Sequence, residues 1–228
     1  MIITIDGPSI SGKTSIARML AQHLGYDYLA SGLLFRGLAY ILVHQFNYHE
    51  SQLYHPQLVD VQAALSPSNF NYMYCRQKGE RLLWKGKDIT AVLSDPLIGK
   101  YASIIGTNQD VRIELAQLQH TLAEGKNVVT DGRDAGSVIF PHALIKFFLT
   151  ASSEVRANRW QKKQELIGRD IPYEQALNEI NELDERDANR RVAPLRIPDG
   201  AIVIDSYDLS QEQVLATLLH EIQKKGGR

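Results

Sequence analysis

Residues 7–14 have the sequence Gly7-Pro8-Ser9-Ile10-Ser11-Gly12-Lys13-Thr14. The spacing fits G-x-x-x-x-G-K-[ST], the Walker A pattern of phosphate-binding loops. The residues just before it, Ile2–Ile5, are mostly apolar and β-branched, which predicts a buried strand. The residues after it, Ser15–Leu24, carry apolar side chains at helical spacing. Such a loop binds phosphates when it lies, as here, between a strand and a helix.

The chemistry of the loop follows from this order. Backbone N–H groups and the positive end of the helix dipole face the phosphates, and Lys13 can reach the β- and γ-phosphates. The hydroxyl of Thr14 can ligate Mg²⁺. We therefore expect ATP to be bound by Gly7, Pro8, Ser9, Ile10, Ser11, Gly12, Lys13, Thr14 and Ser15.

Composition narrows the class of protein. The 228 residues are 44% apolar, which suits one α/β domain with or without an insert. The net charge of −1 gives no broad basic surface, so we expect no nucleic-acid partner. The single cysteine, Cys75, fits a reducing compartment. Because no apolar run approaches ~18 residues and no basic leader precedes the first strand, we expect a protein without membrane contact. We also expect it to be cytoplasmic, which the single cysteine favours, and to be a monomer.

Strand and helix patterns alternate along the chain. Strands are expected to start near residues 2, 26, 127, 144 and 201, with helices between them, which predicts an α/β fold with a five-stranded, mostly parallel sheet. Ser31 and Asp110 stand where helix N-caps belong, and Ser152 and Ser210 stand in similar places.

Residues from about 47 to 95 differ from this pattern. Phe70–Tyr74 alternates like a strand, and Arg81–Trp84 followed by a Lys-Gly-Lys-Asp turn indicates a small meander. The region therefore reads as a β-rich insert. Its aromatic residues Tyr72, Tyr74 and Trp84 could stack on a base, although filling the core of the meander is the favoured reading.

Polar residues gather at the carboxyl ends of the predicted parallel strands, where ligands of such folds bind. Ser31, Arg36, Asp131, Arg133 and Asp134 should converge there with the loop. Two Asp and one Arg this close could hold Mg²⁺, with Asp131 as a ligand, together with a phosphate and a polar substrate edge. The alternatives are a salt-bridged turn and, for Arg36, a solvated side chain.

Two further helices carry arginines. Arg156 and Arg159 lie at i and i+3, on one face of the helix that follows Ser152. A long polar helix from Glu174 to about Arg191 includes Asp187 and Arg190. It is either a solvated helix with ion pairs or a mobile arm that brings arginines over phosphates, and composition does not decide between them.

Across nearly its whole length the chain resembles the bacterial cytidylate kinases, a family of nucleoside monophosphate kinases. The most specific stretches are Asp131-Gly132-Arg133-Asp134 and Asn189-Arg190 with Val192-Ala193-Pro194. Supporting stretches are Ile3–Ser9, Ser31-Gly32 with Arg36, Phe140-Pro141, Ala151–Glu154, Arg186-Asp187 and Asp205-Ser206. The resemblance implies a three-layer P-loop kinase fold over residues 1–228, with a nucleotide-monophosphate-binding insert at about 47–108 and a lid at about 156–194.

The resemblance also implies a reaction, the transfer of the γ-phosphoryl group of ATP to CMP or dCMP with Mg²⁺. It assigns reading of cytosine to Ser103, Arg112 and Asp134, and a ribose contact to Asp187. It assigns Arg36, Arg133 and Arg190 to the acceptor phosphate, and Arg156 and Arg159 to the ATP side. Lys13, Arg133, Arg156, Arg159 and Arg190 are then the catalytic set. Phosphoryl transfer depends mainly on positioning and on neutralising charge, which suits a set of cations.

The chain departs from the family pattern at several positions. The family usually has Gly where Ile10 stands, Tyr where Phe35 stands, and often Arg where Leu183 and Ala188 stand. If position 10 requires φ > 0, the β-branched side chain there costs ~1–3 kcal/mol. These departures motivate two alternatives, a P-loop kinase with a shifted acceptor and a catalytically weak nucleotide-binding module.

Overall fold

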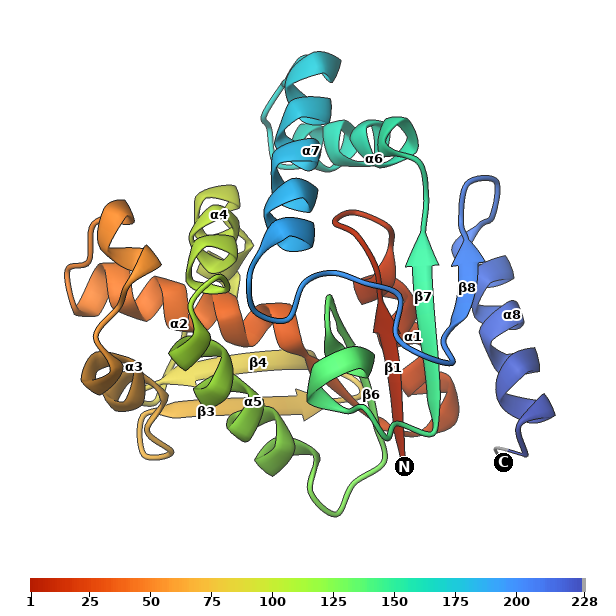
Figure 1. Cartoon of the computed structure of the whole chain (residues 1–228), viewed down its shortest axis with the longest axis horizontal. Helices are drawn as coiled ribbons and strands as arrows, with labels where there is room; N and C mark the ends of the chain where they lie inside the picture. Colours follow the sequence, from red (N-terminus) through yellow and green to blue (C-terminus); the bar gives the residue numbers. More distant parts are fainter. Residues whose placement is uncertain (227–228) are drawn as a thin grey trace. The chain divides into compact units, whose positions relative to one another are not determined.

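The computed structural model describes residues 1–226, and Figure 1 labels its elements. The strands are β1 (Ile2–Asp6), β2 (Asp27–Ala30), β3 (Phe70–Cys75), β4 (Gly79–Trp84), β5 (Lys87–Asp88), β6 (Val128–Gly132), β7 (Ile145–Thr150) and β8 (Ile202–Asp205). The α-helices are α1 (Lys13–Leu24), α2 (Ser31–Gln45), α3 (Leu58–Leu65), α4 (Pro96–Ile105), α5 (Gln109–Ala123), α6 (Ser153–Glu165), α7 (Tyr173–Asn189) and α8 (Gln211–Lys224). Three shorter helical segments are η1 (Glu50–Tyr54), η2 (Ala91–Ser94) and η3 (Ala135–Ile139).

A five-stranded sheet has the strand order β2-β6-β1-β7-β8, as the alternating pattern predicted. β7 pairs in parallel with both β1 and β8. In this register Ile5 lies beside Phe147, and both side chains are fully buried. The four strands predicted after the first one begin within one residue of the expected positions. A smaller antiparallel sheet, β3-β4-β5, forms the predicted meander. The α/β fold class is therefore confirmed.

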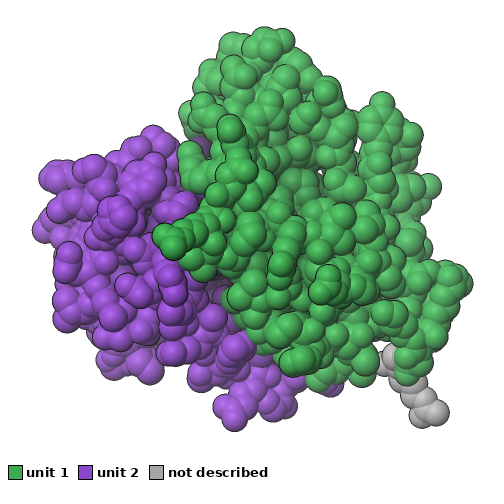
Figure 2. Space-filling model, in the orientation of Figure 1, with its two compact units in different colours: residues 1–25, 129–228 green, residues 26–128 purple. Residues whose placement is uncertain are grey.

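The described residues form two compact units (Figure 2). Unit 1 comprises residues 1–25 and the described residues from 129 onward, and unit 2 comprises residues 26–128. Within unit 1, helices α1 and α8 pack against each other. None of the helices within residues 1–226 is long and apolar enough to span a membrane.

Close packing between β1 and β7 fixes where the phosphate-binding loop begins. Gly7 has φ +146°, and a β-carbon there would collide with the backbone carbonyl oxygen of Leu149. Gly12 then ends the loop at φ 96° as the N-cap of α1, and Gly25 closes that helix at φ 71°. Glycine is therefore required at position 7 both for its backbone angle and for space.

In unit 2, a second close approach joins a helix to the meander. A β-carbon on Gly37 of α2 would collide with the side chain of Leu82 on β4 and would lie 3.2 Å from the ring of Phe70. The aromatic residues of β3 also pair within the unit. The Tyr72 hydroxyl donates to the Tyr28 carbonyl at 2.8 Å, and the rings of Tyr28 and Tyr74 meet edge to face. These contacts favour the packing role over base stacking for the two β3 tyrosines.

Two of the four expected helix caps are wrong, and one helix was missed. α2 already includes Ser31 as its first residue, so its N-cap is Ala30. The side chain that caps α5 is Asn108, which accepts from the Val111 N–H, and Asp110 lies inside the first turn. Asn and Asp are nearly equivalent as caps, so propensity could not separate these two positions. The caps Ser152 and Ser210 are confirmed. Helix α3 has only 8 residues, too few for a clear periodicity.

Asp6, the last residue of β1, is fully buried. Its two carboxylate oxygens accept from the backbone N–H groups of Ala135 and Gly136, at 2.8 and 2.7 Å. Burial raises the pKa of Asp6 to about 6, and these two hydrogen bonds only partly oppose the shift. Asp6 thus ties the end of β1 to the start of η3.

The raised pKa of Asp6 predicts a pH dependence of stability. Because the folded-state pKa lies above the ordinary value of 3.8, the folded protein binds more protons than the unfolded chain between these values. The contribution of Asp6 to the free energy of unfolding should therefore fall by about 2 kcal/mol as the pH rises from about 4 to about 7. Urea denaturation across this range, in wild type and Asp6→Asn, measures it.

In that comparison Asp6→Asn should lack the Asp6 contribution, so its free energy of unfolding should fall less steeply with pH than that of wild type. Losing one of the two backbone hydrogen bonds lowers stability equally at each pH, so it does not change the slope. Equal slopes in both proteins would contradict the buried, ionisable role of Asp6.

Candidate phosphate-binding site

The centre of the candidate site in unit 1 is a buried lysine. Lys13 is only 5% exposed, and its ammonium donates to the Pro8 carbonyl and, at 3.2 Å, to the Ser11 hydroxyl. Burial, and then the nearby positive charge of Arg133, hold the pKa of Lys13 well below its usual value. The loop thus wraps around its own lysine, and the ammonium is held against the backbone that should cradle the phosphates.

Two predicted metal ligands lie next to each other. The Thr14 hydroxyl, at the start of α1, donates to Asp131 Oδ2 at 2.7 Å, and Asp131 is a nearly buried residue of β6. A hydroxyl and a carboxylate are hard oxygen donors, which Mg²⁺ prefers. Within residues 1–226 there is no group of three or more His, Cys, Asp or Glu side chains that could hold a metal. A pair of protein oxygens fits Mg²⁺, which usually takes few protein ligands and fills its shell with water and substrate phosphates.

Four predicted acceptor-site residues form one network in unit 1. Arg133 Nε donates to Asp187 Oδ2 at 2.7 Å. Arg190 donates to Asp187 Oδ1 at 3.4 Å and to Asp134 Oδ1 at 3.3 Å. Its Nε also donates to the Ala193 carbonyl at 2.6 Å, and Ala193 has a positive φ of 49°. The salt bridges expected as an alternative for this segment are therefore present. The guanidinium groups of Arg133 and Arg190 are also of the kind that binds phosphate.

The two predicted ATP-side arginines have different surroundings. Arg156 is nearly buried and donates to the carbonyls of Ala151 and Ser9, at 2.9 and 3.1 Å, and to the carboxylate of Asp184. Arg159 instead donates to the hydroxyl and carbonyl of Ser206, at 3.1 and 2.7 Å. Arg156 therefore contacts the phosphate-binding loop directly, whereas Arg159 contacts the segment after β8.

Unit 2 carries the other four predicted residues, Ser31, Arg36, Ser103 and Arg112. Arg36 donates to the carbonyls of Leu93 and Asp95, at 3.0 and 3.4 Å. Arg112 is nearly buried, donates to the Gly106 carbonyl at 2.9 Å and lies 5.3 Å from the centre of the Phe35 ring. Both arginines are thus fixed by backbone carbonyls within unit 2.

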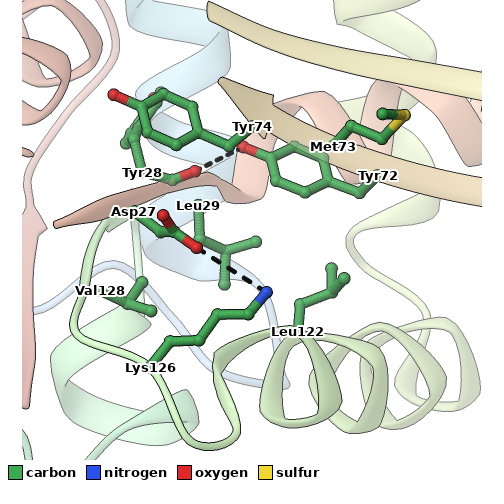
Figure 3. Close-up of a pocket in the computed structure, with 9 residues that line it drawn as sticks. All are labelled: Asp27, Tyr28, Leu29, Tyr72, Met73, Tyr74, Leu122, Lys126 and Val128. Atoms are coloured by element: carbon green, nitrogen blue, oxygen red, sulfur yellow. Dashed lines mark hydrogen bonds and ion pairs between the residues drawn. The ribbon is translucent and has the colours of Figure 1, made fainter. Parts of the chain in front are cut away.

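A cavity of about 270 Å³ in unit 2 contains none of the predicted site residues (Figure 3). Its walls come from β2, β3, the end of α5 with the loop that follows it, and the start of β6. Polar groups of the lining already meet each other, because Lys126 pairs with Asp27 at 3.8 Å and the Tyr72 hydroxyl donates to the Tyr28 carbonyl. We assign it no function.

Sequence reasoning missed three residues that contact the site. Ser206 Oγ donates to the Ser11 carbonyl at 3.4 Å, and Asp6 anchors η3 beside Asp134. Asp184 accepts from Ser9, 175 residues away. The spacing of Asp184 and Asp187 at i and i+3 places them on one face of α7, and this was the available signal.

Ile10 adopts a left-handed backbone conformation, which is strained for a β-branched residue. Its φ is 57°, in the left-handed region, which costs a β-branched residue about 1–3 kcal/mol. The Ile10 side chain packs against an apolar cluster of α6 and α7 that includes Ala157 and Ile180. This burial offsets part of the strain.

Comparison with known proteins places the chain in a family. The cytidylate kinase family model matches residues 3–224. A cytidylate kinase of Mycoplasmoides gallisepticum is 40% identical over 99% of this chain and 94% of its own length. One of Caldanaerobacter subterraneus is 37% identical over 97% of this chain and 94% of its own length.

A solved structure supports the fold alone. An uncharacterized protein from Eubacterium ventriosum superposes with a TM-score of 0.54 at 15% identity, covering 98% of both chains. The family model spans nearly the full length, and the two relatives exceed a third identity over nearly all of it. This chain therefore belongs to the cytidylate kinase family.

Proposed function

We propose that this protein transfers the γ-phosphoryl group of ATP to CMP or dCMP, giving ADP and CDP or dCDP. The observation that carries the proposal is the set of cations in unit 1 of a cytidylate kinase family member. Lys13, Arg156 and the Arg133–Arg190 pair all lie at or next to the phosphate-binding loop or the Asp131–Asp134 segment. The comparisons lend no support to a shifted acceptor or to a weak binding module.

In this proposal the loop binds the triphosphate. Backbone N–H groups of residues 7–15 and the Lys13 ammonium hold the β- and γ-phosphates. An oxygen of the acceptor phosphate attacks the γ-phosphorus, and the bond from that phosphorus to the β-phosphate oxygen breaks. The transferred group carries its charge on three equatorial oxygens, so the cations lower the barrier by neutralising them. No strong general base is needed, because the attacking oxygen is already anionic.

Thr14 and Asp131 would hold Mg²⁺ in this proposal. Their two oxygens lie 2.7 Å apart at the start of α1 and in β6, respectively. When bound, the ion would supply positive charge to the β- and γ-phosphate oxygens. Asp131 would then fix the position of the ion relative to the loop. Thr14 would attach the ion to the first turn of α1, which begins at Lys13.

The acceptor roles are assigned to both units. Arg36, Arg133 and Arg190 would bind the CMP phosphate, Ser103, Arg112 and Asp134 would read cytosine, and Asp187 would contact the ribose. Ser31 would be a further substrate-binding residue. Cytosine presents an amino donor and acceptor positions, which carboxylate, hydroxyl and guanidinium groups complement. Arg133 and Arg190 are each held by Asp187, at 2.7 and 3.4 Å, so their guanidinium groups are preorganised before the acceptor arrives.

The proposal includes the wider setting of the reaction. Residues 47–108 would act as the monophosphate-binding insert and residues 156–194 as the lid, and both would move over bound nucleotides to exclude water. The enzyme would act as a monomer on free nucleotides in the cytoplasm, as part of pyrimidine metabolism. A net charge of −1 and a single cysteine favour this setting.

A panel of acceptors tests the proposed reaction. With Mg·ATP, the release of ADP should be rapid with CMP and dCMP and slow with UMP and AMP, because the polar groups of the base site match the cytosine edge only. A coupled ADP assay run in parallel on the four acceptors measures this. Efficient turnover of AMP without turnover of CMP is the result that rules the proposal out.

Substitution of Lys13 tests the loop. Lys13→Ala should lower kcat at least about 10²-fold, because it removes a cation that stabilises charge in the transition state. Lys225→Ala removes the same charge from an exposed position near the end of α8 and should leave kcat unchanged. Near-normal turnover of Lys13→Ala contradicts the assignment of the loop.

Substitution of Thr14 tests the proposed metal ligand. Thr14→Ala should raise the Mg²⁺ concentration for half-maximal rate about tenfold or more, since it removes one oxygen donor. Thr14→Ser keeps the hydroxyl and should stay close to wild type. The Mg²⁺ dependence of the initial rate at saturating ATP and CMP separates the two variants. Equal Mg²⁺ dependence in both would show that the hydroxyl of Thr14 is not a ligand.

A further inference from the structure

One carboxylate receives three hydrogen bonds from the candidate ATP site. The backbone N–H and the hydroxyl of Ser9 both donate to Asp184 Oδ1, at 3.0 and 2.6 Å. Arg156 donates to Asp184 Oδ2, and the same guanidinium nitrogen donates to the Ser9 carbonyl at 3.1 Å. Asp184 belongs to α7 and Arg156 to α6, two helices that pack against each other (Figure 1).

These three donors are the kind that bind a phosphate oxygen. A backbone N–H of a Walker A loop, a hydroxyl and a guanidinium together complement an anionic oxygen. Ser9 is 4% exposed, and the side chains of Arg156 and Asp184 are 7% and 20% exposed, so water competes little for these bonds. The Asp184 carboxylate therefore occupies donors that suit a nucleotide phosphate.

The next residue of the loop is held by the same pair of helices. The side chain of Ile10 packs on the apolar cluster of α6 and α7 described above, while its backbone stays at φ 57°. A polar contact at Ser9 and an apolar contact at Ile10 thus attach adjacent loop residues to the α6–α7 hairpin. For a phosphate to take the donors of Ser9, the hydrogen bonds from Ser9 to Asp184 must first break.

We propose that Asp184 is an intramolecular competitor of the nucleotide. Its carboxylate takes the Ser9 and Arg156 donors, and a polyphosphate must displace it before the loop and Arg156 can bind phosphate oxygens. Displacement frees the α6–α7 hairpin from Ser9, which couples nucleotide binding to movement of that hairpin. The inference rests on the proposed function only in taking the loop as the polyphosphate site.

The test measures binding without turnover. Asp184→Asn keeps the size of the side chain and removes its charge, so it should bind inorganic tripolyphosphate and ATP about tenfold more tightly than wild type, as expected from the loss of charge-assisted bonds to the competitor. Isothermal titration without CMP gives the dissociation constants. Glu185→Gln removes the same charge from an exposed position of α7 and should change them less than about twofold, which controls for general electrostatics.

A second variant reports the contact itself. In Asp184→Ala the Ser9 amide should exchange its hydrogen with solvent at least about tenfold faster than in wild type, and tripolyphosphate should restore protection in the variant. Unchanged or weaker binding by Asp184→Asn, or unchanged exchange at Ser9 in Asp184→Ala, overturns the inference. Neither readout uses CMP or phosphoryl transfer, so a failure of the proposed reaction would appear separately, in the acceptor panel.

Discussion

Unit 1 depends on pairing of buried positive charge. Lys13, Arg156 and Arg190 are all nearly buried, and a charged group in such a position is stable only if other groups compensate it. The chain supplies this compensation from carboxylates on α7 and after β6, and from loop carbonyls. Because the partners come from distant segments, the charges also fix how α6, α7 and the loop lie within the unit.

We expect these buried ion pairs to add little net free energy of unfolding to the unit. A buried ion pair roughly repays its desolvation, whereas removal of one partner leaves the other uncompensated. The pairs of Arg190 with Asp134 and Asp187 are therefore best understood as positioning. They hold the guanidinium groups in place at a small net free energy, and the apolar strands β1 and β7 supply the burial that stabilises the fold.

Much of this arrangement could be predicted from local sequence. The Walker A spacing, the strand before it and the strands near residues 127, 144 and 201 all depend on short-range patterns, and the structure places them within one residue. The positive φ of Ile10 was foreseeable for a related reason, since the turn needs it whatever residue stands there.

Contacts between distant residues were harder to foresee. The hydrogen bond between Ser9 and Asp184 joins residues far apart in the chain. Helix α7 carries several other acidic residues, and local sequence alone does not show which of them contacts the loop. Sequence spacing indicated which face Asp184 occupies, but only packing decides which loop atom it meets. The choice of Asn108 over Asp110 as a cap has the same origin, because two adequate side chains compete and backbone geometry selects one.

The conformation of Ile10 also gives the protein a built-in optical signal. The cluster that receives this side chain also packs against Trp160, whose indole N–H donates to Glu179 at 2.7 Å. Ile10 and Trp160 thus contact the same apolar cluster of the α6–α7 hairpin. We therefore expect a rearrangement of the loop at Ile10 to alter the surroundings of the Trp160 indole, so that its fluorescence would report on the loop without any added dye.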